Sequence, residues 1–421
     1  MEQTTGFKTI TYRFRLHCEQ EEWLKNTKNI YNEVLQFYYS VLLQEPELES
    51  LGNMQLMRQL ELLSVGSKAE RETKYPVPFG KVPLYFRRAA INDAIRLFRS
   101  FSAGKEHGAN QAGSFGASPV YYKGMYKEFT TESVCLKLFT GERWNWVTCQ
   151  LDACGREFDG TEKFMSPILK VGTKKTMLHV PMQKPVQDVR TVKERLEDKE
   201  SICAVAFPSN DCMAVLVLLS PEGEFLESRF IRGGKELSHR RKNLQKQIQE
   251  NRRRMGAEQW KHSPEENKTL KEKMHRITDD AAHRVSREIV NFCKDKGAGI
   301  IVMPHYKSAL DFTTMAYMSA TNYDWLGRRI ISYVKYKSFG EGIVSTTVNP
   351  GNISAKCYLC GENVKKYNGT STPGVHYYGG KNFVCLNGHK GNSYFNSAMN
   401  IGLKFLRERA GAPAKETEKK S

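Results

Sequence analysis

The sequence contains no apolar run of about 18–20 residues, the length that a membrane-spanning helix needs. The first residues, MEQTTGFKTITYRFRLHC, also lack the regions of a secretory signal peptide. We therefore expect an intracellular protein without a membrane partner. Without a signal peptide, its ten cysteines are more typical of thiols and metal ligands than of a disulfide framework.

Acidic residues are the scarcer of the two charge types. The chain of 421 residues has 64 Lys and Arg against 46 Asp and Glu, a net charge of +18. A surplus of this size predicts a polyanionic partner, most simply nucleic acid, although a merely soluble basic protein has the same composition. The hydrophobic content of 40% excludes wholesale disorder, and the length predicts two to four domains.

The first 200 residues alternate between strand and helix patterns. Residues 8–16 alternate apolar and polar side chains, as a half-buried strand does. Helical periodicity follows over 19–41, 54–63 and 84–101, and strand patterns return at 134–138, 144–146 and 177–180. The simplest architecture is a β-barrel-like unit that is split by a helical insert.

The rest of the chain is typical of an α/β layer structure. Strand patterns occupy 201–207, 213–219, 224–230 and 299–303, and helix patterns occupy 235–255, 265–295 and 323–339. The last residues, 411–421, have the composition of a disordered tail.

Three of the ten cysteines cluster near the C-terminus. Cys357 and Cys360 form a CxxC pair, and Cys385 precedes His389 by four residues. Two such pairs close a tetrahedral zinc site, and Gly388 permits the tight turn that brings His389 to the metal. His376 is the competing fourth ligand, and a metal-free CxxC loop is the alternative. Because no ligand position is open, we expect the zinc to be structural.

Basic side chains concentrate on two predicted helices. Between 231 and 260 there are nine Lys and Arg against three Glu, and apolar residues anchor one face. We expect this helix to neutralise phosphates, although a solvated charged face remains the alternative. The predicted nucleic-acid contacts there are Arg240, Arg241, Lys242, Lys246, Arg252, Arg253 and Arg254. The second group is Arg87, Arg88, Asn92 and Arg96; Arg and Asn are residue types that read base edges, and ordinary helix surface is the alternative.

The C-terminal half resembles the RuvC-like domain of type V-F CRISPR effectors, the miniature Cas-twelve nucleases, and of the related TnpB transposon nucleases. The stretches that carry the resemblance are 283–290 leading into 299–303, 333–340, 348–361 and 396–401. Within 333–340, Lys335 and Lys337 are further predicted nucleic-acid contacts. The N-terminal half fits the same family more loosely, as a split wedge barrel around a recognition lobe.

The resemblance implies a multidomain α+β fold with an RNase H-like α/β domain. The expected domains are two parts of the wedge barrel (1–18 and 121–195), a helical recognition lobe (19–120), the RuvC-like domain with its long basic helix (196–350), a zinc-binding insertion resembling a target-strand-loading element (351–393), the end of the RuvC-like domain (394–410) and the tail.

The resemblance fails at the catalytic carboxylates. Family members hold two divalent metals with three carboxylates, and the matching positions here are Ala206, Pro304 and Tyr394. None of these side chains offers the charged oxygen that magnesium requires. Asp211 and Asp311 are displaced from the expected strand ends, and no Asp or Glu lies between Cys385 and Asn400. We therefore expect no nuclease activity.

The resemblance then implies an RNA-guided protein that binds double-stranded DNA without cutting it. We expect a guide RNA, a target DNA, structural zinc and a homodimer on one guide RNA, in the cytoplasm of a prokaryotic cell at the nucleoid. Such a protein regulates transcription, either by recruiting RNA polymerase through a sigma factor or by occluding a promoter. The alternatives are a magnesium-dependent nuclease that uses Asp211 and displaced carboxylates, and a protein that binds only RNA.

Overall fold

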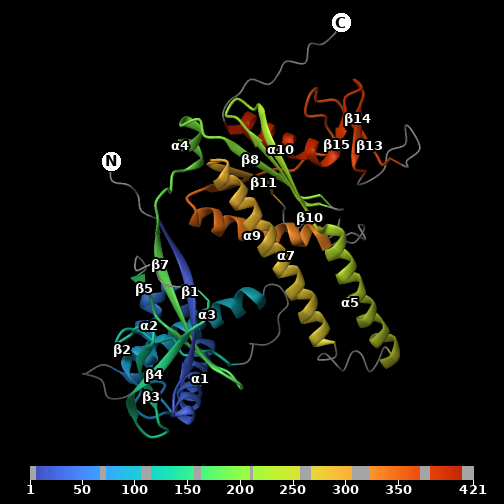
Figure 1. Ribbon diagram of the computed structural model, residues 1–421. Helices are drawn as coiled ribbons and strands as arrows, with labels where there is room; N and C mark the ends of the chain where they lie inside the picture. The colour runs from blue at the N-terminus through green and yellow to red at the C-terminus, as the bar shows by residue number, and fades with distance from the viewer. Residues whose placement is uncertain are drawn as a thin grey trace. The chain divides into compact units, whose positions relative to one another are not determined.

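The computed structural model describes residues 6–66, 73–105, 115–155, 163–208, 212–256, 267–305, 322–369 and 380–409 (Figure 1). The chain forms two compact units. The N-terminal unit is Thr9–Pro185, and the C-terminal unit is Val186–Ser421 together with Met1–Lys8. The division falls earlier than the boundary expected at 195/196. The predicted tail, 411–421, and residues 106–114 of a Gly-rich stretch lie outside the described residues.

The N-terminal unit is a curled sheet with helices packed against it. Its strand order is β2-β3-β4-β1-β7-β5, and β6 pairs with β7. The strands are β1 (Gly6–His17), β2 (Tyr126–Lys127), β3 (Ser133–Phe139), β4 (Trp144–Ala153), β5 (Lys163–Phe164), β6 (Ile168–Val171) and β7 (Thr176–Val186). The helices are α1 (Glu21–Gln44), the short 3-10 helix η1 (Pro46–Ser50), α2 (Asn53–Val65) and α3 (Leu84–Lys105).

The alternation that predicted β1 is confirmed by burial. Tyr12, Phe14 and Leu16 enter the core of the N-terminal unit, whereas Arg13 and Arg15 are exposed on the opposite face. Helices α1 and α3 bury their aromatic side chains in the same core. Strand β1 therefore has one face in the core and one polar face open to solvent.

The C-terminal unit contains a five-stranded sheet of order β10-β9-β8-β11-β12. Its strands are β8 (Ile202–Ala206), β9 (Cys212–Leu219), β10 (Phe225–Arg232), β11 (Ile300–Pro304) and β12 (Val344–Val348). Strand β11 runs parallel to both β8 and β12, whereas β9 is antiparallel to its neighbours. This arrangement confirms the predicted α/β layer.

Helices cover both faces of that sheet. Helix α10 (Ser393–Arg409) packs on one face, and α7 (Lys268–Asp295) with α9 (Asn322–Gly340) packs on the other. Helix α5 (Gly234–Met255) packs against α7, and the short helix α4 (Val192–Glu197) precedes β8. No helix in the described ranges is long and apolar enough to cross a membrane.

A third, small sheet interrupts the chain between β12 and α10. It consists of β13 (Val364–Tyr367), β14 (Asn382–Cys385) and β15 (Lys390–Asn392). Among the residues that the structure describes, its buried centre consists of Cys357, Val364, Phe383 and Cys385. A core this small is a poor source of stability, so a bound metal is the expected substitute.

Candidate metal centre and nucleic-acid surfaces

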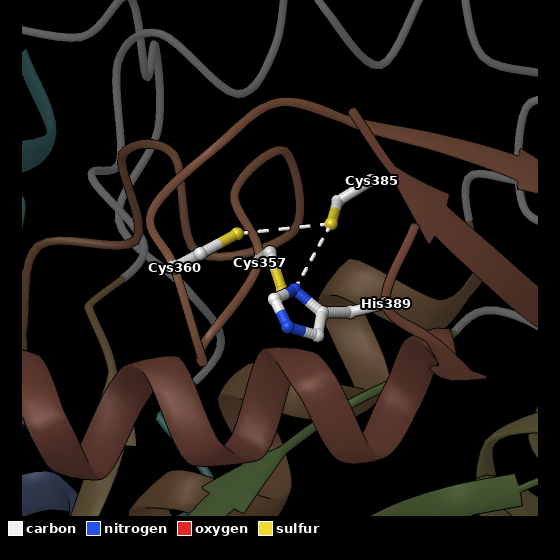
Figure 2. A group of neighbouring side chains, drawn as sticks. All are labelled: Cys357, Cys360, Cys385 and His389. Atoms are coloured by element: carbon white, nitrogen blue, oxygen red, sulfur yellow. Dashed lines mark hydrogen bonds between the residues drawn. The ribbon is translucent and has the colours of Figure 1, made fainter. Parts of the chain in front are cut away.

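The small sheet brings the predicted cysteine and histidine ligands together. The ligand atoms of Cys357, Cys360, Cys385 and His389 all lie within 4.8 Å of one another (Figure 2). Sγ of Cys360 is 3.7 Å from Sγ of Cys385, and Nδ1 of His389 is 3.3 Å from that same sulfur. With zinc–sulfur bonds of about 2.3 Å, sulfurs at two corners of a tetrahedron are about 3.8 Å apart. The residues therefore fit a tetrahedral zinc ion.

Two similar turns deliver these ligands. The amide of Gly361 donates to the carbonyl of Cys357 at 2.8 Å, and the amide of Gly388 donates to the carbonyl of Cys385 at 3.0 Å. Both glycines have positive φ, 77° and 81°, which a residue with a Cβ rarely adopts. The role predicted for Gly388 is confirmed.

The surroundings of Cys360 favour its thiolate. Burial raises the pKa of Cys360, but hydrogen bonds from the amide of Glu362 and from the side chains of His389, Cys385 and Cys357 outweigh it and lower the pKa to about 7. A zinc ligand must be deprotonated, so this environment suits metal binding. The competing ligand His376 lies outside the described residues.

Helix α10 holds the first of these turns in place. Asn396 donates through Nδ2 to the carbonyl of Lys356 at 2.8 Å and accepts the amide of Tyr358 at 2.9 Å. Asn400 donates to the carbonyls of Ile353 at 2.9 Å and Lys356 at 2.7 Å. Both asparagines are at least nine-tenths buried. The stretch 396–400, which carried part of the family resemblance, thus positions the loop that leads into the metal site.

The resemblance implies carboxylates at three positions. Two of them lie at the C-terminal ends of neighbouring central strands of the five-stranded sheet, and the third lies at the start of α10. Ala206 ends β8 and Pro304 ends the neighbouring parallel strand β11, each two residues beyond the paired residues Ala204 and Val302. Tyr394 lies in the first turn of α10 and shares a buried apolar cluster with Ala206. The exposed fractions are 5% for Ala206 and 9% for Tyr394.

Among the described residues, the group of Cys357, Cys360, Cys385 and His389 is the only one of three or more His, Cys, Asp and Glu side chains placed to hold a metal ion. Asp211 and Asp311, the displaced carboxylates, lie outside the described residues. Beside Tyr394 there is a cavity of about 470 Å³. It is lined by Cys212, Phe230, Arg232, Lys381, Asn392 and Tyr394, and sequence reasoning did not find it.

Helix α5 presents most of its predicted phosphate contacts to solvent. The exposed cations are Arg240, Lys242, Lys246, Arg252, Arg253 and Arg254. Arg241 differs, because it is 8% exposed and its Nη1 donates to Oγ1 of Thr278 on α7 at 3.1 Å. Its position four residues after Leu237 and three before Leu244 places it on the buried stripe of the helix. Arg241 therefore joins α5 to α7 rather than facing a phosphate.

The basic residues of α3 are largely occupied by partners in the N-terminal unit. Glu61 on α2 accepts from Arg87 at 3.1 Å and from Arg88 at 2.9 Å, and the pair with Glu61 raises the pKa of Arg88. Asn92 donates to the hydroxyl of Tyr122 at 3.0 Å. These three residues thus have structural partners, which favours the alternative of ordinary helix surface. Arg96 pairs with Asp93 but is 74% exposed, so it remains available to a ligand.

The two lysines of α9 that were predicted as nucleic-acid contacts differ in their exposure to solvent. Lys335 is exposed, whereas Lys337 is 8% exposed and donates to the carbonyl of His283 and to Oγ of Ser286, both at 2.7 Å. Burial, with a smaller contribution from Arg287, lowers the pKa of Lys337 to about 8. Lys337 is therefore a packing residue between α9 and α7.

Sequence reasoning missed a cleft of about 1010 Å³ in the N-terminal unit. Its walls include Arg15, Lys25, Trp146, Lys174 and Lys175, from β1, α1, β4 and the turn between β6 and β7. The ammonium groups of Lys127 and Lys137 lie over the Trp146 ring, at 5.1 and 5.6 Å from its centroid. A signal was present in the sequence, since Arg13 and Arg15 lie on the polar side of the alternation in β1.

Comparisons with known proteins agree with this architecture. A model of the Aq_aa04 family matches residues 8–140. No curated protein matches the chain. The chain is similar to the protein in a structure of a Cas12f1–sgRNA–target DNA complex. The match covers 91% of this chain and 81% of that protein, with 14% sequence identity and a TM-score of 0.53. The chain is also similar to the mini-RNA-guided endonuclease CRISPR-Cas_phi3. That match covers 95% of this chain and 92% of the endonuclease, with 10% sequence identity and a TM-score of 0.51.

These two likenesses extend over nearly the whole chain and confirm the predicted resemblance to miniature type V CRISPR effectors at the level of the fold. The link to TnpB nucleases remains a prediction.

Proposed function

We propose that this chain is an RNA-guided protein that binds matched double-stranded DNA. The support is a fold similar to that of Cas12f1, whose structure contains a guide RNA and target DNA, together with the net charge of +18 and the exposed cations of α5. In this mode, base pairing with the guide reads the sequence, and the protein contacts the nucleic-acid backbone and a short flanking DNA motif.

We propose further that the complex does not cleave the DNA it binds. The observation that supports this is that Ala206 and Pro304 end two neighbouring parallel strands and Tyr394 lies in the first turn of α10, and these are the positions where the resemblance implies carboxylates. Two-metal cleavage needs charged oxygens to hold the ions that activate water and stabilise the leaving oxygen. An apolar strand end and a phenol supply no such charge.

A protein that finds DNA and leaves it intact is suited to regulating transcription. We propose that it binds guide-matched promoters as a homodimer on one guide RNA and recruits RNA polymerase through a sigma factor. Zinc at Cys357, Cys360, Cys385 and His389 would hold the small sheet and take no part in chemistry, because all four tetrahedral positions are filled by protein.

A reconstituted transcription assay, with RNA binding, DNA binding and DNA cleavage scored on the same samples, distinguishes recruitment from its three alternatives. The guide-loaded protein is added to a matched promoter with RNA polymerase, with and without the sigma factor, and a seed-mismatched guide is the control. Sigma-dependent increase of transcript supports recruitment, and a decrease supports promoter occlusion. Unchanged transcription with tight RNA binding but no DNA shift supports an RNA-only protein. DNA cleavage that is lost in Asp211→Ala supports the magnesium-dependent nuclease.

A further inference from the structure

Two cysteines meet at the edge of the cleft in the N-terminal unit. The antiparallel pairing of β1 with β4 ends at His17 and Gln150. One position further along each strand lie Cys18 and Cys149. Directly opposed residues in antiparallel strands have Cα atoms about 4.5–5.5 Å apart, which lies within the range of about 4.4–6.8 Å found for disulfides. The two side chains are close enough for each thiol to shift the pKa of the other.

The two thiols differ in access and in acidity. Cys18 is partly exposed and lines the cleft, whereas Cys149 is fully buried. The neighbouring Cys149 thiol lowers the pKa of Cys18 to about 7, against the effects of burial and of Glu19 and Glu21. The neighbouring Cys18 thiol, followed by burial, raises the pKa of Cys149 well above its ordinary value. An accessible thiolate beside a second thiol is the arrangement of a redox-sensitive pair.

We propose that Cys18 and Cys149 form a reversible disulfide when the protein meets a peroxide. The Cys18 thiolate attacks one oxygen of hydrogen peroxide, and the O–O bond breaks to give a sulfenic acid and hydroxide. Hydroxide takes the proton of Cys149, whose sulfur then attacks the Cys18 sulfur and releases hydroxide. Overall, two thiols and one hydrogen peroxide give one disulfide and two waters, and a dithiol reverses the reaction.

The disulfide would tie the segment that enters α1 to strand β4. That segment and β4 both contribute to the cleft wall that carries Arg15, Lys25 and Trp146. Oxidation would therefore restrict the motion of this wall. In a reducing compartment the pair stays as thiols until an oxidant arrives, which makes it a modification site rather than a structural staple.

The C-terminal unit offers a matched pair of thiols that lacks solvent access. Cys203 is on β8 and Cys293 on α7, and the neighbouring Cys203 thiol, together with burial, raises the pKa of Cys293. Both side chains are completely buried in the sheet core. Because no oxidant reaches them without unfolding, they should remain reduced when Cys18 and Cys149 react.

The test treats the folded full-length chain with hydrogen peroxide, alkylates the remaining thiols and maps the tryptic peptides by mass spectrometry. Residues 16–25 and 144–156 are the peptides that contain Cys18 and Cys149. The second also contains the exposed Cys154, so a Cys154→Ser chain is mapped in parallel. We expect the two peptides to be linked in both chains, the link to vanish with a dithiol, and the peptides of Cys203 and Cys293 to be alkylated only after unfolding.

Several results would overturn the proposal. One is a Cys18 that is oxidised or alkylated without any link to Cys149, and another is a link that disappears in the Cys154→Ser chain. Equal oxidation of the Cys203–Cys293 pair would show that cleft access does not select the site.

Discussion

Asn400 of helix α10 donates a hydrogen bond of 2.7 Å to the carbonyl of Lys356, the residue that precedes the first zinc-ligand cysteine. The contact joins the α/β layer to the small sheet, whose own core is too small to be stable by itself. Asn396 makes a second contact to the same carbonyl. The position of the metal site therefore depends on α10 as much as on the ligands.

We predict that Asn400→Ala lowers the free energy of unfolding by about 1–3 kcal/mol, because it removes two hydrogen bonds from a buried side chain and leaves the partly buried carbonyls of Ile353 and Lys356 with fewer donors. Chemical denaturation measures the change, and zinc affinity should fall with it. Ser397→Ala is the control, since the Ser397 hydroxyl bonds only within its own helix, to the carbonyl of Ser393. Equal destabilisation by both variants would contradict the role of Asn400.

We predict about one zinc ion per chain, held by His389 rather than His376. His389→Ala should lose most of the zinc, measured by elemental analysis after gel filtration, and should make residues 351–392 sensitive to protease. His376→Ala should keep both the zinc and the protease resistance. The reverse pattern would assign the fourth ligand to His376.

We predict that the exposed end of α5 binds RNA electrostatically. Substitution of Arg252, Arg253 and Arg254 by alanine should weaken RNA binding and reduce the slope of log affinity against log salt by about 2, the value for three lost contacts to a single strand. Fluorescence anisotropy across a salt series measures this slope. An unchanged slope would leave α5 as a solvated helix.

Arg241 provides a contrast on the same helix. Because it is buried against Thr278, Arg241→Met should lower the free energy of unfolding by about 1–3 kcal/mol while the salt dependence of RNA binding stays the same. Denaturation and the same anisotropy series distinguish the two effects. A reduced salt slope with unchanged stability would restore Arg241 as a phosphate contact.

We predict that Lys337 makes stability depend on pH in the alkaline range. Its pKa is lowered to about 8 in the folded protein, against about 10.4 when unfolded. Between these values the unfolded chain binds more protons, so stability rises with pH, by up to about 1.4 kcal/mol per pH unit from this group. The Lys337→Met variant should lack that rise, so the free energy of unfolding of the wild type minus that of the variant should increase between about pH 8 and pH 10. Parallel curves for the two proteins would contradict the shift.

Hydrophobic periodicity predicted nearly all of the larger elements. The helices over 19–41, 84–101 and 235–255 correspond to α1, α3 and α5, because apolar residues recur at helical spacing in each, although in α5 only Leu237 and Leu244 are buried apolar side chains. Strand β12 (VSTTV) and the strands of the small sheet were missed, since they are short and have too few apolar residues to show alternation.

The zinc ligands were predictable because their spacing reflects local turn geometry. The basic residues were harder, because charge identifies a residue type and not its burial. Arg241 and Lys337 both lie on the apolar stripes of their helices, three residues from Leu244 and Val334 respectively, so the period of the helix already contained the signal. The partner of Arg87 and Arg88, Glu61, comes from another helix and is visible only in the fold.

The central claim is guided binding without cleavage. The most direct test loads the purified chain with its co-purifying RNA, incubates it with a DNA library in magnesium, and scores bound and cut molecules separately. We predict enrichment of guide-matched duplexes that remain intact, with the same result when magnesium is left out of the buffer. Magnesium-dependent cutting of those duplexes, abolished by Asp211→Ala, would contradict the claim and identify an active nuclease.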